Sequence, residues 1–273
     1  MRIVRNKFAR VPLALALLSG CSPEPAPAPA PTPTTTAPAA PAGPVLGPRE
    51  VAFSSGADQV VAYLARPQGQ GPFPALVVIH EWWGLNQQIR GMADQLARQG
   101  YLSLAVDLYR GKQTDNSELA HELMRGLPED RALRDLAAAF AYLKASPEVQ
   151  PDRIGSIGWC MGGGYSIRMA MAEPTLAACV VYYGPLPTER ESLAAIQAPV
   201  LGFFGDKDEG IPEASVLDFD NAMRELGKQV QVHVYRNAGH AFANRDSKSF
   251  HTLASDDAWG KLNAFLGRHL KGE

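Results

Sequence analysis

The sequence of 273 residues contains no apolar run long enough to span a bilayer and no cluster of basic residues. A membrane-spanning helix needs about 20 apolar residues, so the composition argues against a spanning protein. A net charge of −2 without a basic run gives no reason to expect nucleic-acid binding. No internal repeat of solenoid length is visible either. The 46% hydrophobic and 20% charged fractions instead indicate a soluble globular protein with a substantial core.

The first 20 residues have the pattern of an export signal. A basic start, with Arg2, Arg5, Lys7 and Arg10, precedes the short apolar run 11–18 and a small-residue processing site. The apolar run is too short to cross a membrane. Loss of this segment would change the net charge from −2 to −6, because it carries four basic residues and no acidic one.

The tetrapeptide LSGC, which ends at Cys21, resembles the lipobox of bacterial lipoproteins. The resemblance implies that Cys21 becomes a lipidated N-terminus and that Ser22 directs the protein to the outer membrane. The alternative is an ordinary secretory signal cleaved nearby. Residues 21–48 are rich in Pro, Ala and Thr, which favours extended polyproline II and predicts a tether. We therefore expect an exported protein, periplasmic or on the cell surface, anchored to a bacterial membrane.

Residues 49–273 alternate short β-rich runs with amphipathic helical patterns, which predicts one α/β domain with a mostly parallel sheet. Runs such as ALVVI and VLGFF are apolar throughout, as expected of strands covered by helices on both faces. The predicted strands are 60–64, 75–80, 102–106, 153–157, 177–183, 200–205 and 231–235. The predicted helices are 89–99 with Asn86 as N-cap, one containing Leu133, Leu136, Phe140 and Leu143, one containing Val216, Phe219, Met223 and Leu226, and 255–269.

The stretch GWCMGG, residues 158–163, places Cys160 between a predicted strand and a helix that begins near Gly163. In a nucleophile elbow, the residues two before and two after the nucleophile must be very small, because a Cβ there would strike a neighbouring strand or helix. Gly158 and Gly162 meet this requirement. The helix N-terminus would also lower the thiol pKa and place backbone N–H groups near a developing oxyanion. The alternative is an inert, buried cysteine.

A nucleophilic cysteine needs a base and an acid that orients the base. In α/β-hydrolases the chain order is nucleophile, acid, histidine, each at the C-terminal end of a strand. Asp208 follows the predicted strand 200–205 in GFFGDKD, and His240 follows the strand 231–235. Order and placement together predict a Cys160–His240–Asp208 catalytic triad.

Five motifs occur in the order and spacing of the dienelactone hydrolase family: HEWWGLN, DLYRG, GWCMGG, GDKDEGIP and GHAFAN. The resemblance covers about residues 49–270. It implies an α/β-hydrolase fold with a mostly parallel central sheet and helices on both faces. It also implies hydrolysis of small-molecule lactones or esters through an acyl-thiol intermediate, in the manner of a carboxymethylenebutenolidase, without a cofactor. Rival interpretations are a hydrolase of thioesters or small peptides and a non-catalytic surface protein that binds ligands.

The resemblance assigns roles to residues at the end of the strand 75–80. Glu81 matches the family's glutamate, which lies near the nucleophile and controls its ionisation; the alternative is a solvated loop glutamate. The backbone N–H groups of Trp82 and Met161 match the family's oxyanion hole. His80 begins HEWWG, which lacks the second histidine of a zinc-binding H-E-x-x-H motif, so we expect no metal.

Two positions depart from the family's pattern. The family binds a substrate carboxylate with arginines where this chain has Gly111 and Asn244, whereas Arg110 and Arg245 stand one residue away. These displaced arginines are the candidate carboxylate ligands. Aromatic residues beside the motifs are candidates for an acyl pocket, with ordinary packing as the alternative: Trp82, Trp83, Tyr109, Trp159 and Phe242.

The third cysteine, Cys179, lies inside the apolar run AACVVYY and is most simply a core residue. The alternative is a disulfide with Cys160, since an exported protein enters an oxidising compartment. Such a bond would bury the nucleophile.

Overall fold

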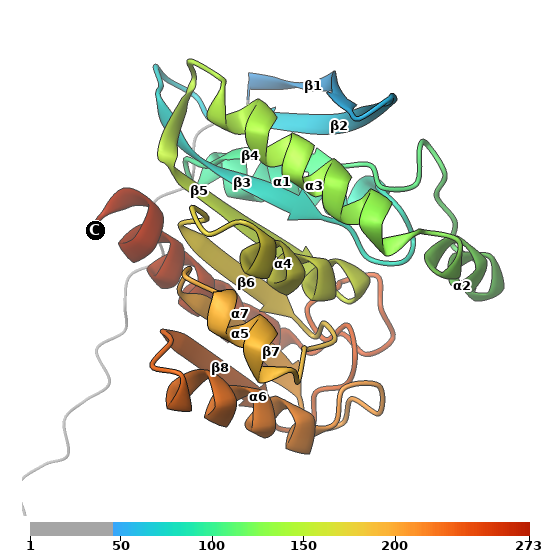
Figure 1. Ribbon diagram of the computed structural model, residues 1–273. Helices are drawn as coiled ribbons and strands as arrows, with labels where there is room; N and C mark the ends of the chain where they lie inside the picture. The colour runs from blue at the N-terminus through green and yellow to red at the C-terminus, as the bar shows by residue number, and fades with distance from the viewer. Residues whose placement is uncertain (1–45) are drawn as a thin grey trace, which may run out of the picture. The chain divides into compact units, whose positions relative to one another are not determined.

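Eight strands form one sheet in residues 46–273, the part of the chain that the computed structural model describes (Figure 1). The strand order is β1-β2-β4-β3-β5-β6-β7-β8. β2 is antiparallel to β1 and to β4, and the pairs from β4 to β8 are parallel. The strands are β1 (Leu46–Ser55), β2 (Asp58–Arg66), β3 (Phe73–Ile79), β4 (Leu102–Val106), β5 (Val149–Trp159), β6 (Ala178–Tyr182), β7 (Val200–Gly205) and β8 (Val230–Tyr235).

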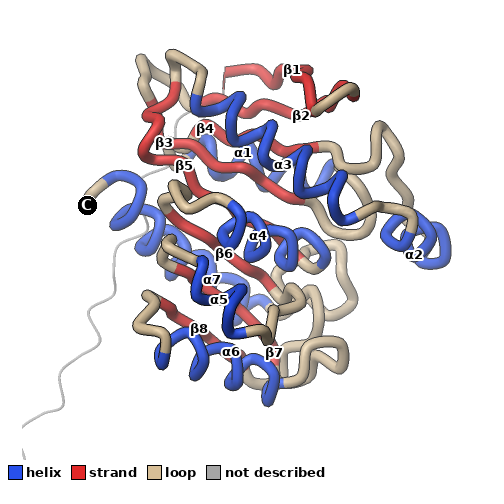
Figure 2. The backbone as a smooth tube through the Cα atoms, in the orientation of Figure 1, coloured by secondary structure: helices blue, strands red, loops and turns tan. Residues whose placement is uncertain are grey.

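Helices cover both faces of the sheet. Figures 1 and 2 show α3, α4, α5 and α6 on one face and α1 and α7 on the other. Parallel neighbours require such crossover connections, which place helices over the sheet. The helices are α1 (Gln87–Arg98), α2 (Ser117–Arg125), α3 (Glu129–Lys144), α4 (Met161–Ala172), α5 (Arg190–Ala195), α6 (Glu213–Glu225), α7 (Thr252–Leu266) and the π-helical turn η1 (Gly267–Lys271).

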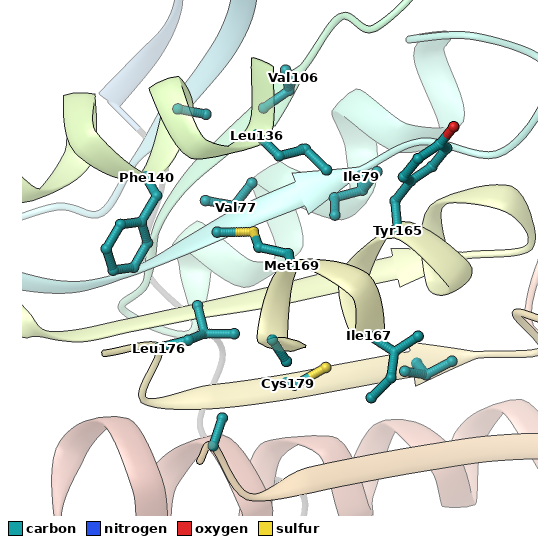
Figure 3. Packing of buried hydrophobic residues seen from close by; sticks show 14 of the residues in the cluster. Val77, Ile79, Val106, Leu136, Phe140, Tyr165, Ile167, Met169, Leu176 and Cys179 are labelled. Atoms are coloured by element: carbon teal, nitrogen blue, oxygen red, sulfur yellow. The ribbon is translucent and has the colours of Figure 1, made fainter. Parts of the chain in front are cut away.

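The apolar strands divide their side chains between two cores. On one face, Val77 and Ile79 of β3 pack with Leu136 of α3 and Ile167 of α4 (Figure 3). The other face buries alternate residues of the same strand, including Val78, against α1 and α7. The continuous apolar runs in the sequence therefore come from strands buried on both faces, as predicted.

The predicted strands and helices all exist, and the predictions of 102–106 and 200–205 coincide with β4 and β7. Asn86 is the N-cap of α1, since its side chain accepts a hydrogen bond from the N–H of Ile89 at 3.1 Å. Three elements were not predicted: β1, α2 and α5. β1 lies at the sheet edge and is paired on one side only, and α2 buries only Ala120, so both contribute little to the core.

Both cysteines of the described domain are free thiols, so the structure does not contain the alternative Cys160–Cys179 disulfide. Cys179 lies in β6 and is fully buried, as expected of a core residue. Burial raises the pKa of its thiol to about 11.

The predicted export signal, Cys21 and nearly all of the predicted tether lie outside the described residues. Among the helices of residues 46–273, none combines the length and the apolar character that crossing a membrane requires.

Candidate active site

The turn at Cys160 joins β5, which ends at Trp159, to α4, which begins at Met161. Cys160 has φ 53° and ψ −122°, a conformation that non-glycine residues adopt only under strain. A Cβ at Gly158 would lie 2.1 Å from the carbonyl oxygen of Gly162, and one at Gly162 would lie 2.3 Å from that of Ile79. The close approach of helix and strands therefore requires both glycines and holds the thiol in place.

His240 and Asp208 meet at the C-terminal edge of the sheet, after β8 and β7 respectively. Nδ1 of His240 lies 2.7 Å from Oδ2 of Asp208. The other carboxylate oxygen of Asp208 accepts hydrogen bonds from the N–H groups of Gly210 at 2.9 Å and Ile211 at 3.1 Å. Asp208 is thus a fixed, buried acceptor that orients the imidazole and leaves Nε2 for the thiol.

The protonation of His240 depends on its two partners. Burial disfavours the imidazolium, but hydrogen bonds to Asp208 and Cys160 and the charges of both outweigh burial and raise the pKa of His240 to about 10. The imidazole of His240 therefore remains protonated near neutral pH.

Glu81 follows β3 and is only 2% exposed, which excludes the alternative of a solvated loop residue. Its Oε2 accepts a hydrogen bond from the Asn244 amide at 2.8 Å, and its Oε1 accepts one from the Tyr183 hydroxyl at 3.4 Å. Burial outweighs these bonds and raises the pKa of Glu81 to about 7. Within the described domain no hydrogen bond joins Glu81 to Cys160, but the Tyr183 ring lies edge-on to His240, with centroids 5.2 Å apart.

Asn244 and Tyr183 are site residues that the sequence reasoning missed. In the sequence, Asn244 stands out only as a position where the family has an arginine. Its exact partner depends on the folding of a loop 163 residues away from Glu81 in the chain. Tyr183 lay in an apolar run, AACVVYY, whose pattern indicates burial but not a polar contact at its end.

His80 is fully buried and uses both ring nitrogens within the chain. Nδ1 lies 2.6 Å from the carbonyl oxygen of Glu81, and Nε2 accepts a hydrogen bond from the N–H of Leu108 at 3.3 Å. Burial lowers the pKa of His80, which favours the neutral ring that these roles require. His80 therefore ties the end of β3 to the end of β4.

Arg110 binds other groups of the protein. Its guanidinium lies 2.8 Å from Asp135 of α3, donates to the carbonyl oxygen of Asp107 at 3.4 Å and lies 3.8 Å from Asp58. Asp135 is fully buried on the apolar face of α3. That single acidic residue on a buried face was the sequence signal for this pair. Contact between Arg110 and substrate stays a prediction.

Arg245 lies with its guanidinium over the ring of Phe250, 5.3 Å from the centroid. It lines a cavity of about 420 Å³ whose wall includes none of Cys160, Asp208 and His240. Its contact with substrate also stays a prediction. Gly111 stands at one of the two positions where the family has an arginine. Its backbone N–H donates a hydrogen bond to the carboxylate of Asp107.

The predicted aromatic residues separate into two groups. Tyr109 donates its hydroxyl to the sulfur of Met161 at 3.2 Å, and the rings of Trp82 and Trp83 meet edge to face. Tyr109 is also buried, in the core of the other face, and Phe242 and Trp159 are almost fully buried in the core under α1 and α7. Packing is therefore the role that the structure shows for these last two.

Comparisons with known proteins agree with this geometry. The sequence model of the dienelactone hydrolase family matches residues 60–270. A Bradyrhizobium protein described as a probable 2-oxo-3-(5-oxofuran-2-ylidene)propanoate lactonase is 31% identical over 226 residues, which cover 78% of this chain and 91% of that protein. A Methylorubrum extorquens protein, provisionally named a carboxymethylenebutenolidase, is 32% identical over 225 residues. The match covers 77% of this chain and 77% of that protein.

A solved structure shows the same arrangement in three dimensions. The crystal structure of a provisionally assigned dienelactone hydrolase from Klebsiella pneumoniae matches with a TM-score of 0.77 and 29% sequence identity. The match covers 83% of this chain and 100% of that one. The eight-stranded, mostly parallel sheet with helices on both faces is accordingly an α/β-hydrolase fold.

Proposed function

This chain belongs to the dienelactone hydrolase family and is a hydrolase, and from that premise we propose that it cleaves carboxylic esters or lactones with Cys160 as nucleophile. The observation that carries the proposal is the strained turn at Cys160, beside a histidine held 2.7 Å from a buried aspartate. Strain of this kind costs about 1–3 kcal/mol and persists where the surrounding structure requires it. A cysteine that only filled space would not need it.

The first half-reaction forms an acyl-thiol. The sulfur of Cys160 bonds to the acyl carbon, and the carbonyl electron pair moves to the oxygen, which the N–H groups of Trp82 and Met161 stabilise. When the pair returns, the bond from carbon to the leaving oxygen breaks. His240 donates its proton to that oxygen. With a lactone, the alcohol formed stays attached to the acyl chain.

The second half-reaction releases the acid. His240, now neutral at Nε2, takes a proton from water while the water oxygen bonds to the acyl carbon. The carbon–sulfur bond then breaks, and the thiolate returns to its place beside the imidazolium. Asp208 holds Nδ1 throughout, so that the imidazole neither rotates nor changes tautomer.

We propose that Glu81 is a positioning residue for this chemistry. Its carboxyl group reaches Tyr183, whose ring lies against His240. A pKa of about 7 means that the carboxyl group gains or loses a proton near neutral pH, so the charge beside the triad changes in the range where the enzyme would work.

The substrates that we propose are uncharged near the reacting carbonyl. The guanidinium of Arg110 is paired with Asp135, and that of Arg245 lies over Phe250. The Bradyrhizobium relative is described as the lactonase of a propanoate, so its name supports lactones as one substrate class, whereas the neutral charge that we propose rests on Arg110 and Arg245 alone.

The experiment is turnover of p-nitrophenyl acetate and of simple lactones, with denaturing mass spectrometry of the protein during the reaction. Wild-type protein should gain the mass of one acyl group, and Cys160→Ala should neither gain it nor turn over. Cys160→Ser should be much weaker than wild type, since a hydroxyl has a higher pKa than a thiol. Cys179→Ala is the matched control and should keep its activity, because Cys179 is buried in the core. More than a few per cent of wild-type turnover in Cys160→Ala would refute the mechanism.

We also propose that Cys21 carries a lipid anchor on an exported protein, on the basis of LSGC and the proline-rich stretch that follows it. Stable anchoring needs more than one acyl chain, which bacterial lipoprotein modification supplies. Full-length protein should fractionate with membranes, and Cys21→Ser should move to the soluble fraction. Wild-type protein in the soluble fraction would contradict the anchor.

A further inference from the structure

Tyr183 follows β6, a central strand of the sheet (Figure 1), and its backbone has φ 38°, in the left-handed region. The side chain is fully buried. A bulky residue in this region is strained, and such strain persists only where the surrounding structure requires it. Cys160, at the end of the neighbouring strand β5, has φ 53°. Two adjacent parallel strands therefore end in turns of the same unusual kind.

The turn changes the face on which the Tyr183 side chain lies. Successive side chains of a strand point to opposite faces of the sheet. In β6, Cys179 and Val181 belong to the core beneath α3 and α4. Val180 and Tyr182 belong to the core beneath α1 and α7. A regular strand would return Tyr183 to the first core, but it lies in the second beside Tyr182. The positive φ thus brings its side chain to the other face.

On that face Tyr183 contacts two functional side chains. Its ring lies edge-on to the imidazole of His240, with centroids 5.2 Å apart and planes at 62°, and Phe242 packs on it at 5.4 Å. Its hydroxyl donates to Oε1 of Glu81 at 3.4 Å. Burial, followed by the charge of Glu81, holds the pKa of the Tyr183 hydroxyl well above its usual value, so the hydroxyl stays a donor.

The imidazole of His240 needs such a support. Asp208 binds Nδ1, but one hydrogen bond at one ring nitrogen fixes a point of the ring and leaves it free to turn about that bond. The His240 side chain is 40% exposed, so the protein packs on only part of it. The Tyr183 ring supplies a wall that limits the tilt of the imidazole.

The turn at Tyr183 also lies directly against the turn at Cys160. The carbonyl oxygen of Tyr182 accepts a hydrogen bond from the N–H of Cys160 at 3.0 Å. A Cβ at Gly184 would lie 2.4 Å from the backbone nitrogen of Gly164 in α4. Because backbone meets backbone there, with no room for a side chain, the two turns cannot move independently. The position of the Tyr183 ring is therefore fixed relative to the nucleophile.

We propose that Tyr183 is a positioning residue that ties His240 and Glu81 to the turn that carries Cys160. Its ring holds the imidazole in one plane, and its hydroxyl holds the carboxyl group beside the triad. The inference rests on the proposed function, because the plane of the imidazole matters to the reaction only if His240 transfers protons. A displacement of about 1 Å in a reacting group can lower a rate about 100-fold.

Tyr183→Leu and Tyr183→Phe separate the ring from the hydroxyl. Tyr182→Leu is the matched control, since Tyr182 is adjacent, 2% exposed and in the same core, with its ring stacked on Trp159. The full-length chain and p-nitrophenyl acetate are used to measure kcat and KM. Far-UV circular dichroism and urea unfolding check the fold of each variant, and denaturing mass spectrometry detects the acyl group on wild type.

We expect kcat of folded Tyr183→Leu to fall about 10- to 100-fold while KM changes less than about threefold, because a positioning residue acts on the reacting groups. Tyr182→Leu should also lose stability but should keep kcat within about threefold. Tyr183→Phe keeps the ring, so its kcat should fall only about three- to tenfold, as for the loss of one hydrogen bond.

A double-mutant cycle tests the hydroxyl separately, and it carries the test if Tyr183→Leu does not fold. Glu81→Gln should lower kcat of wild type but should change that of Tyr183→Phe less than about twofold, because the link is already broken.

Three outcomes overturn the role of Tyr183. One is an equal fall of kcat in folded Tyr183→Leu and Tyr182→Leu. Another is a fall in Tyr183→Phe as large as in Tyr183→Leu, and the third is that the effects of Tyr183→Phe and Glu81→Gln multiply. All three leave the proposed function intact if wild type is acylated at Cys160. A wild type that is never acylated would refute the proposed function, and this inference with it.

Discussion

Two buried carboxylates of this protein, Asp208 and Asp135, each hold one basic side chain. Asp208 is 4% exposed and lies 2.7 Å from His240, whereas Asp135 is fully buried and lies 2.8 Å from Arg110. The first pair orients a group that can give up its proton. The second compensates a charge inside the scaffold with a guanidinium that stays protonated. Similar geometry thus serves folding in one region and, in the function that we propose, catalysis in the other; the partner's ability to titrate distinguishes the two pairs.

Asp208→Asn should show the largest effect, and it should be an effect on activity. An asparagine keeps the shape but can hold the imidazole in the wrong tautomer, so kcat should fall about 10³–10⁴-fold. Ester turnover measures this, and urea unfolding should show a change of stability below about 1.5 kcal/mol. A fall of less than tenfold in kcat would mean that the Asp208–His240 pair is structural, like the Asp135–Arg110 pair.

Gly162→Ala tests how far the catalytic region depends on its turn. The added Cβ would lie 2.3 Å from the carbonyl oxygen of Ile79, so the turn must shift. We expect turnover to fall about 100-fold or more and stability to fall by about 1–3 kcal/mol. Gly260→Ala, in open space within α7, is the control and should be neutral or stabilising. Unchanged turnover in Gly162→Ala would contradict the assigned elbow.

Glu81→Gln should change activity and stability in opposite directions. Because burial raises the folded-state pKa of Glu81 from 4.5 to about 7, the folded state binds more protons than the unfolded state between these pH values. Its contribution to stability is therefore greatest below pH 4.5 and is lost as pH rises through 7. At pH 8 the variant should be more stable than wild type, by up to about 3 kcal/mol.

Urea unfolding of Glu81→Gln and wild type at pH 5 and pH 8 measures this difference, which should shrink at the lower pH. Turnover of the variant should fall and should lose the wild-type dependence on pH near 7. If turnover is unchanged, Glu81 has no part in positioning the triad.

Arg110→Ala should show the smallest effect on chemistry and a clear effect on folding. Removal of the guanidinium leaves Asp135 buried without its partner. Because Arg110 is partly exposed and water can enter, we expect a loss of about 1–3 kcal/mol, less than for a fully buried pair. Turnover of neutral esters should change less than twofold. Arg134→Ala, whose partner Asp58 is about half exposed, is the control, with a loss below about 1 kcal/mol. If Arg110→Ala instead raised KM for acidic lactones and not for neutral esters, the predicted contact between Arg110 and substrate would be supported.

Local pattern was sufficient for most of the framework. Apolar runs located central strands such as β3, β6 and β7, because a strand that is buried on both faces is apolar at nearly every position. The edge strand β1 and the largely exposed helix α2 were not predicted, and both are short amphipathic segments with few buried residues. The Asn86 cap was predicted because capping depends on a few consecutive residues.

The sequence by itself determined the order of Cys160, Asp208 and His240 along the chain and the glycines around Cys160. The order can be recognised because each of the three residues follows a predicted strand. The glycines can be recognised because the steric limits of the turn act within six consecutive residues, 158–163. Only the tertiary structure decided that Glu81 meets Asn244 and that Arg110 meets Asp135. Each of these depends on side chains from distant segments, and a loop shifted by one residue sends a side chain to a different partner.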